Sequence, residues 1–230
     1  MIRRLLAGEE VEARGEVVRL DRGRLDFTPR RASIPIYVAS NGPLGQRAAG
    51  AGADGAIMEG CGSQAEARAL AAAVAAGAGE AGRAAAAVEL VARLNACIGP
   101  DGKAARDVLR PRVARTLGGG RLRFATLEAQ GPALPEEARR RVAGVPYAPG
   151  LTPYLPLLPL ITDRVVDALA LAGTVEEVTE RVIALARAGI GQIMIHPFAP
   201  AGGHVDDTIR RFGQEVVPAA RRALGDRRTA

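Results

Sequence analysis

Short apolar runs alternate with longer segments of helical pattern along most of the chain, which is typical of a βα-repeat protein. The runs consist of small or β-branched residues, so they favour buried parallel strands. They predict strands at residues 34–39, 55–58, 88–98 and 192–196. Because parallel strands need crossover connections that cover the sheet, the pattern predicts an α/β fold with one parallel sheet.

The segments between these strands carry apolar residues at helical spacing or are rich in alanine. Two of them open on capping signals, because Glu66 lies three residues after Ser63 and Glu177 three residues after Thr174. Prolines interrupt the pattern farther along, so we expect an irregular insertion at about 118–161. The predicted helices span residues 44–52, 64–81, 101–117, 135–142, 175–188 and 206–224.

The N-terminal segment departs from this alternation. Ile2–Gly8 has the pattern of a helix end, and Glu16–Phe27 has that of a hairpin whose turn lies at Asp21–Gly23. The length of 230 residues falls in the range of one α/β barrel, so we expect a single domain over residues 1–230.

Charge and composition narrow the classes of partner. The formal net charge of +6 suggests nucleic-acid binding at first sight. However, the arginines are spread along the chain among acidic residues, Lys103 is the single lysine, and only 3% of the residues are aromatic and suited to base stacking. We therefore expect no nucleic-acid partner. The scarcity of aromatic residues also means that the core is built from alanine, valine, leucine and isoleucine.

Neither a membrane span nor a metal site is predicted. No apolar stretch approaches the about 18 residues of a spanning helix, and the first residues lack the apolar core of a signal peptide. Cys61 and Cys97 have neither metal-ligand nor disulfide-framework spacing, so we expect small buried residues. The expected location is the cytoplasm, without a membrane partner.

The first candidate site follows the predicted strand at 34–39. In a parallel α/β sheet, ligands bind at the C-terminal ends of the strands. Here that end carries Ala39, Ser40, Asn41 and Gly42, whose small side chains allow close backbone approach, and a predicted helix then directs its N–H groups at the turn. The turn is a candidate phosphate site. Spacing alone favours the alternative of an ordinary strand-to-helix turn.

Two further strand ends carry candidate substrate-pocket residues. Glu59, Gly60 and Cys61 follow the second strand, where a plain glycine loop is the alternative. His196 ends the last strand and could donate a proton or orient a substrate. No titratable partner lies near it in sequence, so a structural hydrogen bond is the alternative. His204, in a glycine-rich loop, is a weaker candidate.

The sequence IPIYVASNGPLGQRAAGAGADGAIMEG, residues 34–60, resembles the luciferase-like monooxygenase family, and within it the deazaflavin-dependent reductases. The matching features are the strand Pro35–Ser40, the turn Gly42–Pro43 and the helix end Ala53–Gly55. RLDFTPR at Arg24–Arg30 and the segment Ala168–Phe198, which includes TVEEVTERVIALARAGIGQIMIHPF, are also similar to the family's. The resemblance extends over nearly the whole chain.

This resemblance implies a TIM (β/α)8 barrel with coenzyme F-420 or FMN lying across its C-terminal mouth. It implies that Ala39, Ser40, Asn41 and Gly42 help to hold the cofactor phosphate. Asn41 is a departure, because relatives often have a smaller residue there. Family members begin with four βα units that this chain lacks, so we expect an N-terminally truncated partial barrel that self-associates. Catalytic residues remain unassigned.

By resemblance, the chain is expected to act as an oxidoreductase or monooxygenase on a small-molecule substrate, with hydride transfer by the cofactor. Two alternatives stay open: a non-catalytic half-barrel remnant or interaction module, and another phosphate-binding barrel enzyme such as an isomerase or aldolase. No lysine lies at a strand end, which argues against a Schiff-base aldolase.

Overall fold

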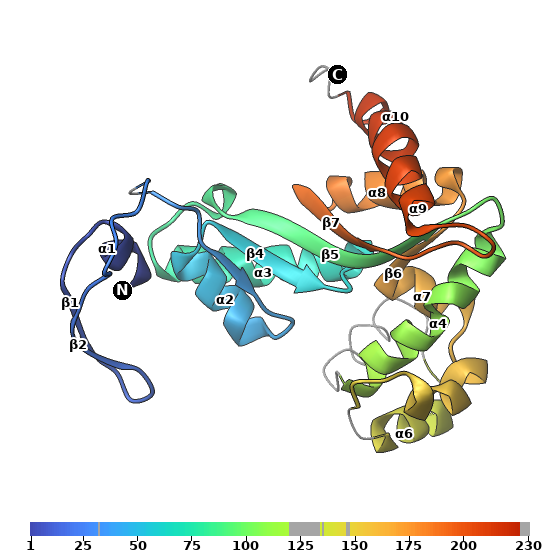
Figure 1. Cartoon of the computed structure of the whole chain (residues 1–230), viewed down its shortest axis with the longest axis horizontal. Coiled ribbons are helices and arrows are strands. Elements are labelled where there is room, and N and C mark those ends of the chain that lie inside the picture. The colour runs from blue at the N-terminus through green and yellow to red at the C-terminus, as the bar shows by residue number, and fades with distance from the viewer. Residues whose placement is uncertain (32, 120–133, 135, 146–147, 226–230) are drawn as a thin grey trace. The chain divides into compact units, whose positions relative to one another are not determined.

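The computed structural model describes residues 1–31, 33–119, 134, 136–145 and 148–225. It divides the chain into two compact units, Met1–Ile36 and Tyr37–Ala230, where the sequence pattern predicts one domain (Figure 1). The N-terminal unit holds helix α1 (Ile2–Leu6) and an antiparallel pair of strands. The second unit holds the parallel sheet and its helices.

The N-terminal unit contains a hairpin, but the predicted bounds of 16–27 and the predicted turn at 21–23 are wrong. The hairpin strands are β1 (Val11–Arg14) and β2 (Arg19–Gly23), and the chain reverses between them, where the Gly15 N–H donates to the Val18 carbonyl. The turn-like residues at 21–23 lie within β2 instead. Arg22 has a φ of 47°, and the strand register shifts opposite it. Residues typical of a turn therefore form an irregularity in a strand rather than a reversal.

Five parallel strands form the sheet of the second unit. The four predicted strands are confirmed, although the first is shorter than 34–39. The fifth, at residues 170–173, was not predicted, because it follows a helix directly and has no β-branched residue. The strands are β3 (Tyr37–Ala39), β4 (Gly55–Glu59), β5 (Glu89–Ile98), β6 (Ala170–Gly173) and β7 (Gln192–Pro197).

The long strand β5 pairs with three neighbours. Its first half pairs with β4 and its second half with β6, while β7 runs along the middle. Asn95 and Ala96 pair with both β6 and β7, so these two strands lie on opposite edges of β5. Strand β4 also overlaps β7 along β5, so β4 and β6 share one edge. In the described part of the chain the sheet stays open, since β3 pairs with β4 alone.

The predicted helices are confirmed, with small differences at their ends. The Ser63 hydroxyl caps the N–H of Glu66, and the capping box of Thr174 and Glu177 forms with bonds of 2.8 and 3.3 Å. The helices are α2 (Pro43–Gly52), α3 (Gln64–Glu80), α4 (Gly102–Gly119), α6 (Glu136–Gly144), α7 (Asp163–Leu169), α8 (Val175–Arg187), α9 (Val205–Arg211) and α10 (Val217–Ala223), with short turns η1 (Ala85–Ala87), η2 (Thr152–Leu160) and η3 (Phe212–Val216).

The last predicted helix, 206–224, is interrupted by the π-helical turn η3 between α9 and α10. Pro218 lies in the first turn of α10 and has no N–H to donate to the preceding turn. A π-helical turn of this kind is rare and occurs mostly as a single turn within a longer helix.

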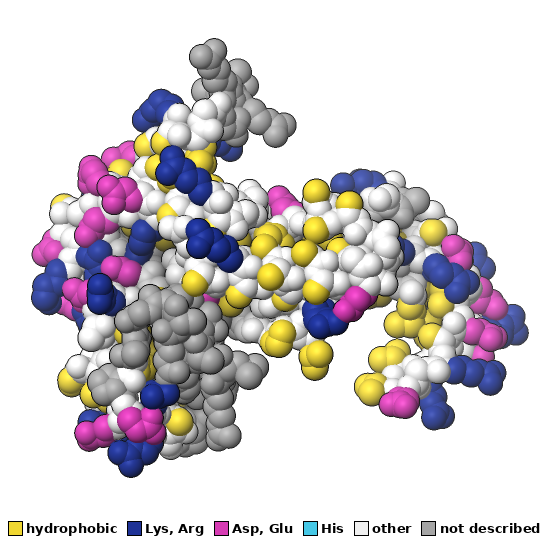
Figure 2. Space-filling model, turned by 180° about the vertical axis from the view of Figure 1, so that it is seen from behind, with side chains coloured by type: hydrophobic (Ala, Val, Ile, Leu, Met, Phe, Trp, Pro, Cys, Tyr) yellow, Lys and Arg dark blue, Asp and Glu magenta, His cyan; other side chains and the backbone are white. Residues whose placement is uncertain are grey.

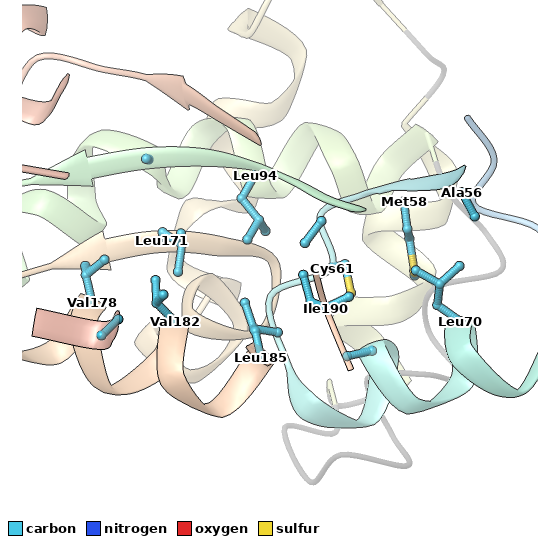
Figure 3. Packing of buried hydrophobic residues seen from close by; sticks show 14 of the residues in the cluster. Ala56, Met58, Cys61, Leu70, Leu94, Leu171, Val178, Val182, Leu185 and Ile190 are labelled. Atoms are coloured by element: carbon cyan, nitrogen blue, oxygen red, sulfur yellow. The ribbon is translucent and has the colours of Figure 1, made fainter. Parts of the chain in front are cut away.

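One hydrophobic core lies between the sheet and the helices that cover it. Ala56 and Met58 of β4 and the even-numbered residues of β5 belong to it. Figure 3 shows these strand side chains directed toward Leu70 of α3 and Leu185 of α8. The core consists of small and aliphatic side chains, as expected from the composition. We call this side of the sheet the helix-side face.

A second core joins α4, α6, η2 and α7 (Figure 1). Leu109, Val142 and Tyr154 are buried in it, and Cys97 at the end of β5 connects it to the sheet. The predicted insertion at about 118–161 therefore includes ordered helices packed around an aromatic residue. Residues 120–133 of the insertion lie outside the described residues.

Glycines allow helices α2 and α3 to pack against each other closely. A Cβ atom on Gly77 would overlap the carbonyl of Arg47 in α2, and one on Gly50 would overlap the carbonyl of Val74 in α3. Gly79, in the same helix as Gly77, has open space around it. Close approach thus depends on particular glycines rather than on a general scarcity of large side chains.

Gly77→Ala is expected to destabilise the protein by about 1–3 kcal/mol, because the added methyl group forces the two helices apart. Gly79→Ala is the matched control and should be neutral, or stabilising by up to about 1 kcal/mol, because alanine favours the helix. Urea unfolding followed by circular dichroism measures both. Equal free energies of unfolding for the two variants would contradict the close packing.

Candidate functional site

The face of the sheet opposite the helix-side core carries most of the candidate residues. Successive side chains of a strand alternate between faces, and paired residues of parallel strands share a face. Of the rows that the strand registers place on this side, Cys97–Ala172 is buried in the second core, and we call the other four the open face. From the N-terminal to the C-terminal end of the strands, the rows are Tyr37–Gly55–Glu89, Ala39–Ile57–Val91–Gln192, Glu59–Arg93–Met194 and Asn95–His196.

Polar contacts across the open face join different strands of the sheet. The Tyr37 hydroxyl donates to the Glu89 carboxylate, and this hydrogen bond raises the pKa of the tyrosine. The ring crosses Gly55 to reach Glu89, since a Cβ atom on Gly55 would overlap it. In the third row, Arg93 forms an ion pair with Glu59 at 2.6 Å. The open face thus differs chemically from the aliphatic helix-side face.

The turn after β3, which carries the candidate phosphate site, is held by short-range hydrogen bonds. The Ser40 N–H donates to the Ile57 carbonyl at 2.9 Å, which holds the turn beside the end of β4. The Ser40 hydroxyl lies 3.2 Å from both the N–H and the carbonyl oxygen of Gly42. The backbone is therefore folded tightly at the C-terminal end of the sheet.

Helix α2 begins directly at this turn. Gly42 is its N-cap residue and Pro43 follows, and no side chain caps the first-turn N–H groups. A Cβ atom on Gly45 would overlap the Ser40 side chain, so glycine permits the helix to start this close to the strand. Uncapped N–H groups and the positive end of the helix dipole favour an anion at such a position.

Asn41 has a structural partner. Its side-chain oxygen accepts a hydrogen bond from the Glu59 N–H at 2.9 Å. The bond joins the C-terminal ends of β3 and β4, two of the three strand ends that the sequence singled out. A smaller apolar residue at position 41 could not accept this hydrogen bond, which gives the asparagine a structural role.

The residues after β4 differ in exposure. Glu59 is exposed and paired with Arg93, whereas Gly60 and Cys61 are buried. Gly60 has a φ of 68°, which favours glycine, and its N–H donates to the Arg93 carbonyl at 2.7 Å. Cys61 is fully buried in the helix-side core, as expected for a small apolar residue. Of the three, Glu59 alone carries a side chain on the open face.

His196 is exposed at the end of β7 and stacks on an aromatic ring. Its ring centroid lies 4.9 Å from that of Phe198, with 27° between the planes. The guanidinium of Arg112, from α4, lies 4.0 Å from the Phe198 centroid. No local sequence pattern predicts this cluster, because α4 and β7 are far apart along the chain. His204 lies apart from it, at the start of α9.

Thr208 fixes the position of Phe198. This fully buried residue of α9 accepts a hydrogen bond from the Ile98 N–H at 3.1 Å and donates one to the Phe198 carbonyl at 2.7 Å. The Phe198 N–H in turn donates to the Ala96 carbonyl at 2.8 Å. The C-terminal ends of β5 and β7 are therefore joined as firmly as those of β3 and β4.

The charged side chains do not gather into a patch of one sign on the face shown in Figure 2, where Lys and Arg are interspersed with Asp and Glu. Among the residues that the structure describes, no group of three or more His, Cys, Asp or Glu side chains is suited to hold a metal ion. No helix in the described ranges is long and apolar enough to cross a membrane.

Comparison with known proteins identifies the family. The family model described as luciferase-like monooxygenase matches residues 1–192, which is most of the chain. The chain belongs to the luciferase-like monooxygenase family. The resemblance noted in the sequence is thus confirmed, and the parallel α/β sheet agrees with it.

Two archaeal 5,10-methylenetetrahydromethanopterin reductases are similar to this luciferase-like chain. The Archaeoglobus fulgidus protein is 27% identical over 221 residues, which are 95% of this chain and 63% of the relative. The Methanopyrus kandleri protein is 26% identical over 95% of this chain and 60% of its own length. The chain therefore spans about three fifths of the length of these relatives.

Solved structures show the same fold. The coenzyme F-420-dependent tetrahydromethanopterin reductase of Methanopyrus kandleri superimposes with a TM-score of 0.77 at 22% identity, over 94% of this chain and 60% of that one. An F-420-dependent secondary alcohol dehydrogenase in complex with an F-420–acetone adduct gives a TM-score of 0.68 at 20% identity, over 96% and 59%.

The thiol of Cys97, at the end of β5, allows the burial of this end of the sheet to be tested. Burial raises the pKa of its thiol to about 11, against a smaller opposing effect of Arg211. Because the folded state disfavours the thiolate, this contribution to stability is complete below the ordinary pKa of 9.0 and is lost as the pH approaches 11. We expect the free energy of unfolding to fall between pH 9 and pH 11, and to fall less in Cys97→Ala than in the wild type.

Urea unfolding at a series of pH values measures this free energy for both proteins. An equal pH dependence in the two proteins would contradict the burial of Cys97.

Proposed function

We propose that this chain binds the phosphate side of coenzyme F-420 or FMN and takes part in hydride transfer between that cofactor and a small-molecule substrate. The observation that carries the proposal is the turn at Ala39–Gly42, which lies at the C-terminal end of the sheet and leads into the uncapped start of α2. Membership of the luciferase-like monooxygenase family supports it.

The proposed roles differ along the turn. The N–H groups at the start of α2 receive the phosphate, and Gly42 leaves room for its approach. Ser40 and Asn41 hold the turn in place through the bonds to Gly42 and Glu59. Ala39 lies in the second row of the open face, next to Ile57, where a larger side chain would project beside the cofactor.

The cofactor supplies the redox chemistry when it is bound, and the protein positions it. The relatives favour coenzyme F-420, because the reductase and the alcohol dehydrogenase of similar fold are both described as F-420-dependent. At the C-terminal end of the sheet, Glu59, Gly60 and His196 are proposed to border the substrate, while Cys61 supports them from the core. We place this activity in the cytoplasm.

Gly42→Val is expected to weaken cofactor binding about tenfold or more, because the larger side chain keeps the phosphate from the first-turn N–H groups and removes a charge-assisted hydrogen bond. Gly52→Val, at the other end of the same helix with open space around it, is the matched control. Titration of both variants with F-420 and with FMN, followed by absorbance, measures the affinities.

Circular dichroism of each variant before titration verifies that it is folded. Similar affinities for the wild type and both variants would contradict the assignment of the turn. Failure of the wild type to bind either cofactor would overturn the proposed function and favour a non-catalytic interaction module.

We also propose that the chain self-associates through the open face. Tyr37 and Met194 expose 39% and 42% of their surface on it, although both are large hydrophobic residues. Burying apolar surface of this kind favours association by roughly 25 cal/mol per Å². The strands β3 and β7 at the ends of the pairing order add backbone groups that a second chain can pair with.

Met194→Glu is expected to shift the protein toward monomer, because a carboxylate in the third row of the open face resists burial. Leu44→Glu, on the strongly exposed side of α2, introduces the same charge elsewhere and should leave association unchanged. Sedimentation velocity over a range of concentrations measures the mass. A wild-type monomer at all concentrations would contradict the proposed association.

A further inference from the structure

Arg112, Phe198 and His196 form a cluster that places a guanidinium and an exposed histidine ring against one phenylalanine ring. Phe198 contacts the Arg112 guanidinium at 4.0 Å and the His196 ring at 4.9 Å. The cluster lies at the C-terminal ends of β5 and β7, next to Asn95 in the fourth row of the open face. Its residues come from α4, from the end of β7 and from the loop that follows.

Arg112 carries a charge that the described residues do not neutralise. Its neighbours Arg106 and Arg110 on α4 each pair with carboxylates, at 2.9 Å to Asp167 and 2.5 Å to Asp163. No described carboxylate pairs with Arg112. Partial burial, followed by repulsion from Arg115, lowers the pKa of its guanidinium. A half-buried guanidinium whose donors no described carboxylate accepts, beside an aromatic ring, is suited to bind an oxyanion.

The aromatic part of the cluster is positioned in advance. Thr208 and Ala96 fix the backbone of Phe198 on both sides through the hydrogen bonds described above. Held in this way, Phe198 supports the stacked His196 ring from behind, and the exposed His196 ring offers a flat surface without further ordering of the loop. Planar rings stack on such a surface, and little entropy is lost when the surface is rigid.

We propose that Arg112, Phe198 and His196 form a binding site for a planar ring that carries a carboxylate or phosphate group. Arg112 receives the oxyanion, and the exposed His196 ring, which Phe198 supports from behind, receives the planar part. This proposal rests on the proposed function, since the site lies at the same end of the sheet as the phosphate turn. There it would select substrates that contain a planar ring and an anionic group. Thr208 is a positioning residue for Phe198.

The two histidines of the chain make the site directly observable. The ring protons of His196 should shift in NMR spectra when a ligand stacks on the cluster, whereas those of His204, at the start of α9, should not. His196→Gln and His204→Gln assign the signals. The probes are benzoate and phenyl phosphate, with cyclohexanecarboxylate and inorganic phosphate as the non-planar and ring-free counterparts.

Benzoate and phenyl phosphate are expected to shift the His196 signals and to bind about threefold or more tightly than their counterparts. Arg112→Gln should weaken binding of both about tenfold or more, whereas Arg187→Gln, the same charge change at an exposed position of α8, should not. Phe198→Leu, which retains Arg112, should remove the preference for planar probes.

Three results would overturn the proposal: no shift of His196 at any probe concentration, equal effects of Arg112→Gln and Arg187→Gln, or equal binding of planar and non-planar probes. Circular dichroism confirms that each variant is folded. The titrations contain no F-420 or FMN, so their outcome is independent of cofactor binding. Loss of cofactor affinity in Gly42→Val together with unchanged probe binding would separate the phosphate turn from this site.

Discussion

Pairing with β5 positions most of the second unit. This strand is long enough for β4 and β6 to share one edge while β7 occupies the other, so three strands take their register from one. Its even-numbered residues form the helix-side core, its odd-numbered residues from Glu89 to Asn95 form the open face, and Cys97 packs in the second core. Successive side chains of a strand point to opposite faces of the sheet. A shift of one residue in any of these pairings would therefore exchange aliphatic and polar side chains between the two faces.

The two faces meet different physical requirements. The helix-side face packs alanines, leucines and valines against α3 and α8, where glycines let the covering helices approach each other. The open face holds polar side chains in pairs that cross between strands, as in the hydrogen bond of Tyr37 with Glu89 and the ion pair of Glu59 with Arg93. Gly55 links the two requirements, because its missing side chain lets the Tyr37 ring cross β4. Gly55, the last residue of the Ala53–Gly55 segment that resembles the family, thus has a packing role.

The C-terminal end of the sheet is held together by hydrogen bonds between segments distant in sequence. Asn41 joins β3 to β4, and Thr208 joins the end of β5 to the loop after β7. A site that must hold a cofactor phosphate and a substrate in fixed relation needs strand ends that do not move independently. These bonds supply that rigidity at the end where luciferase-like proteins are expected to bind their ligands.

The sequence by itself determined the elements and their class. Apolar runs predicted four strands, capping signals at Ser63 and Thr174 predicted helix starts, and the turn after β3 could be identified as a candidate phosphate site. These signals are local, since each depends on residues within a few positions of one another. The tertiary structure alone decided that Asn41 bonds to Glu59, that Arg112 reaches Phe198, that residues 170–173 form a strand, and that residues 21–23 extend a strand instead of turning. Each of these depends on a partner brought close by folding, and no pattern of neighbouring residues encodes such a partner.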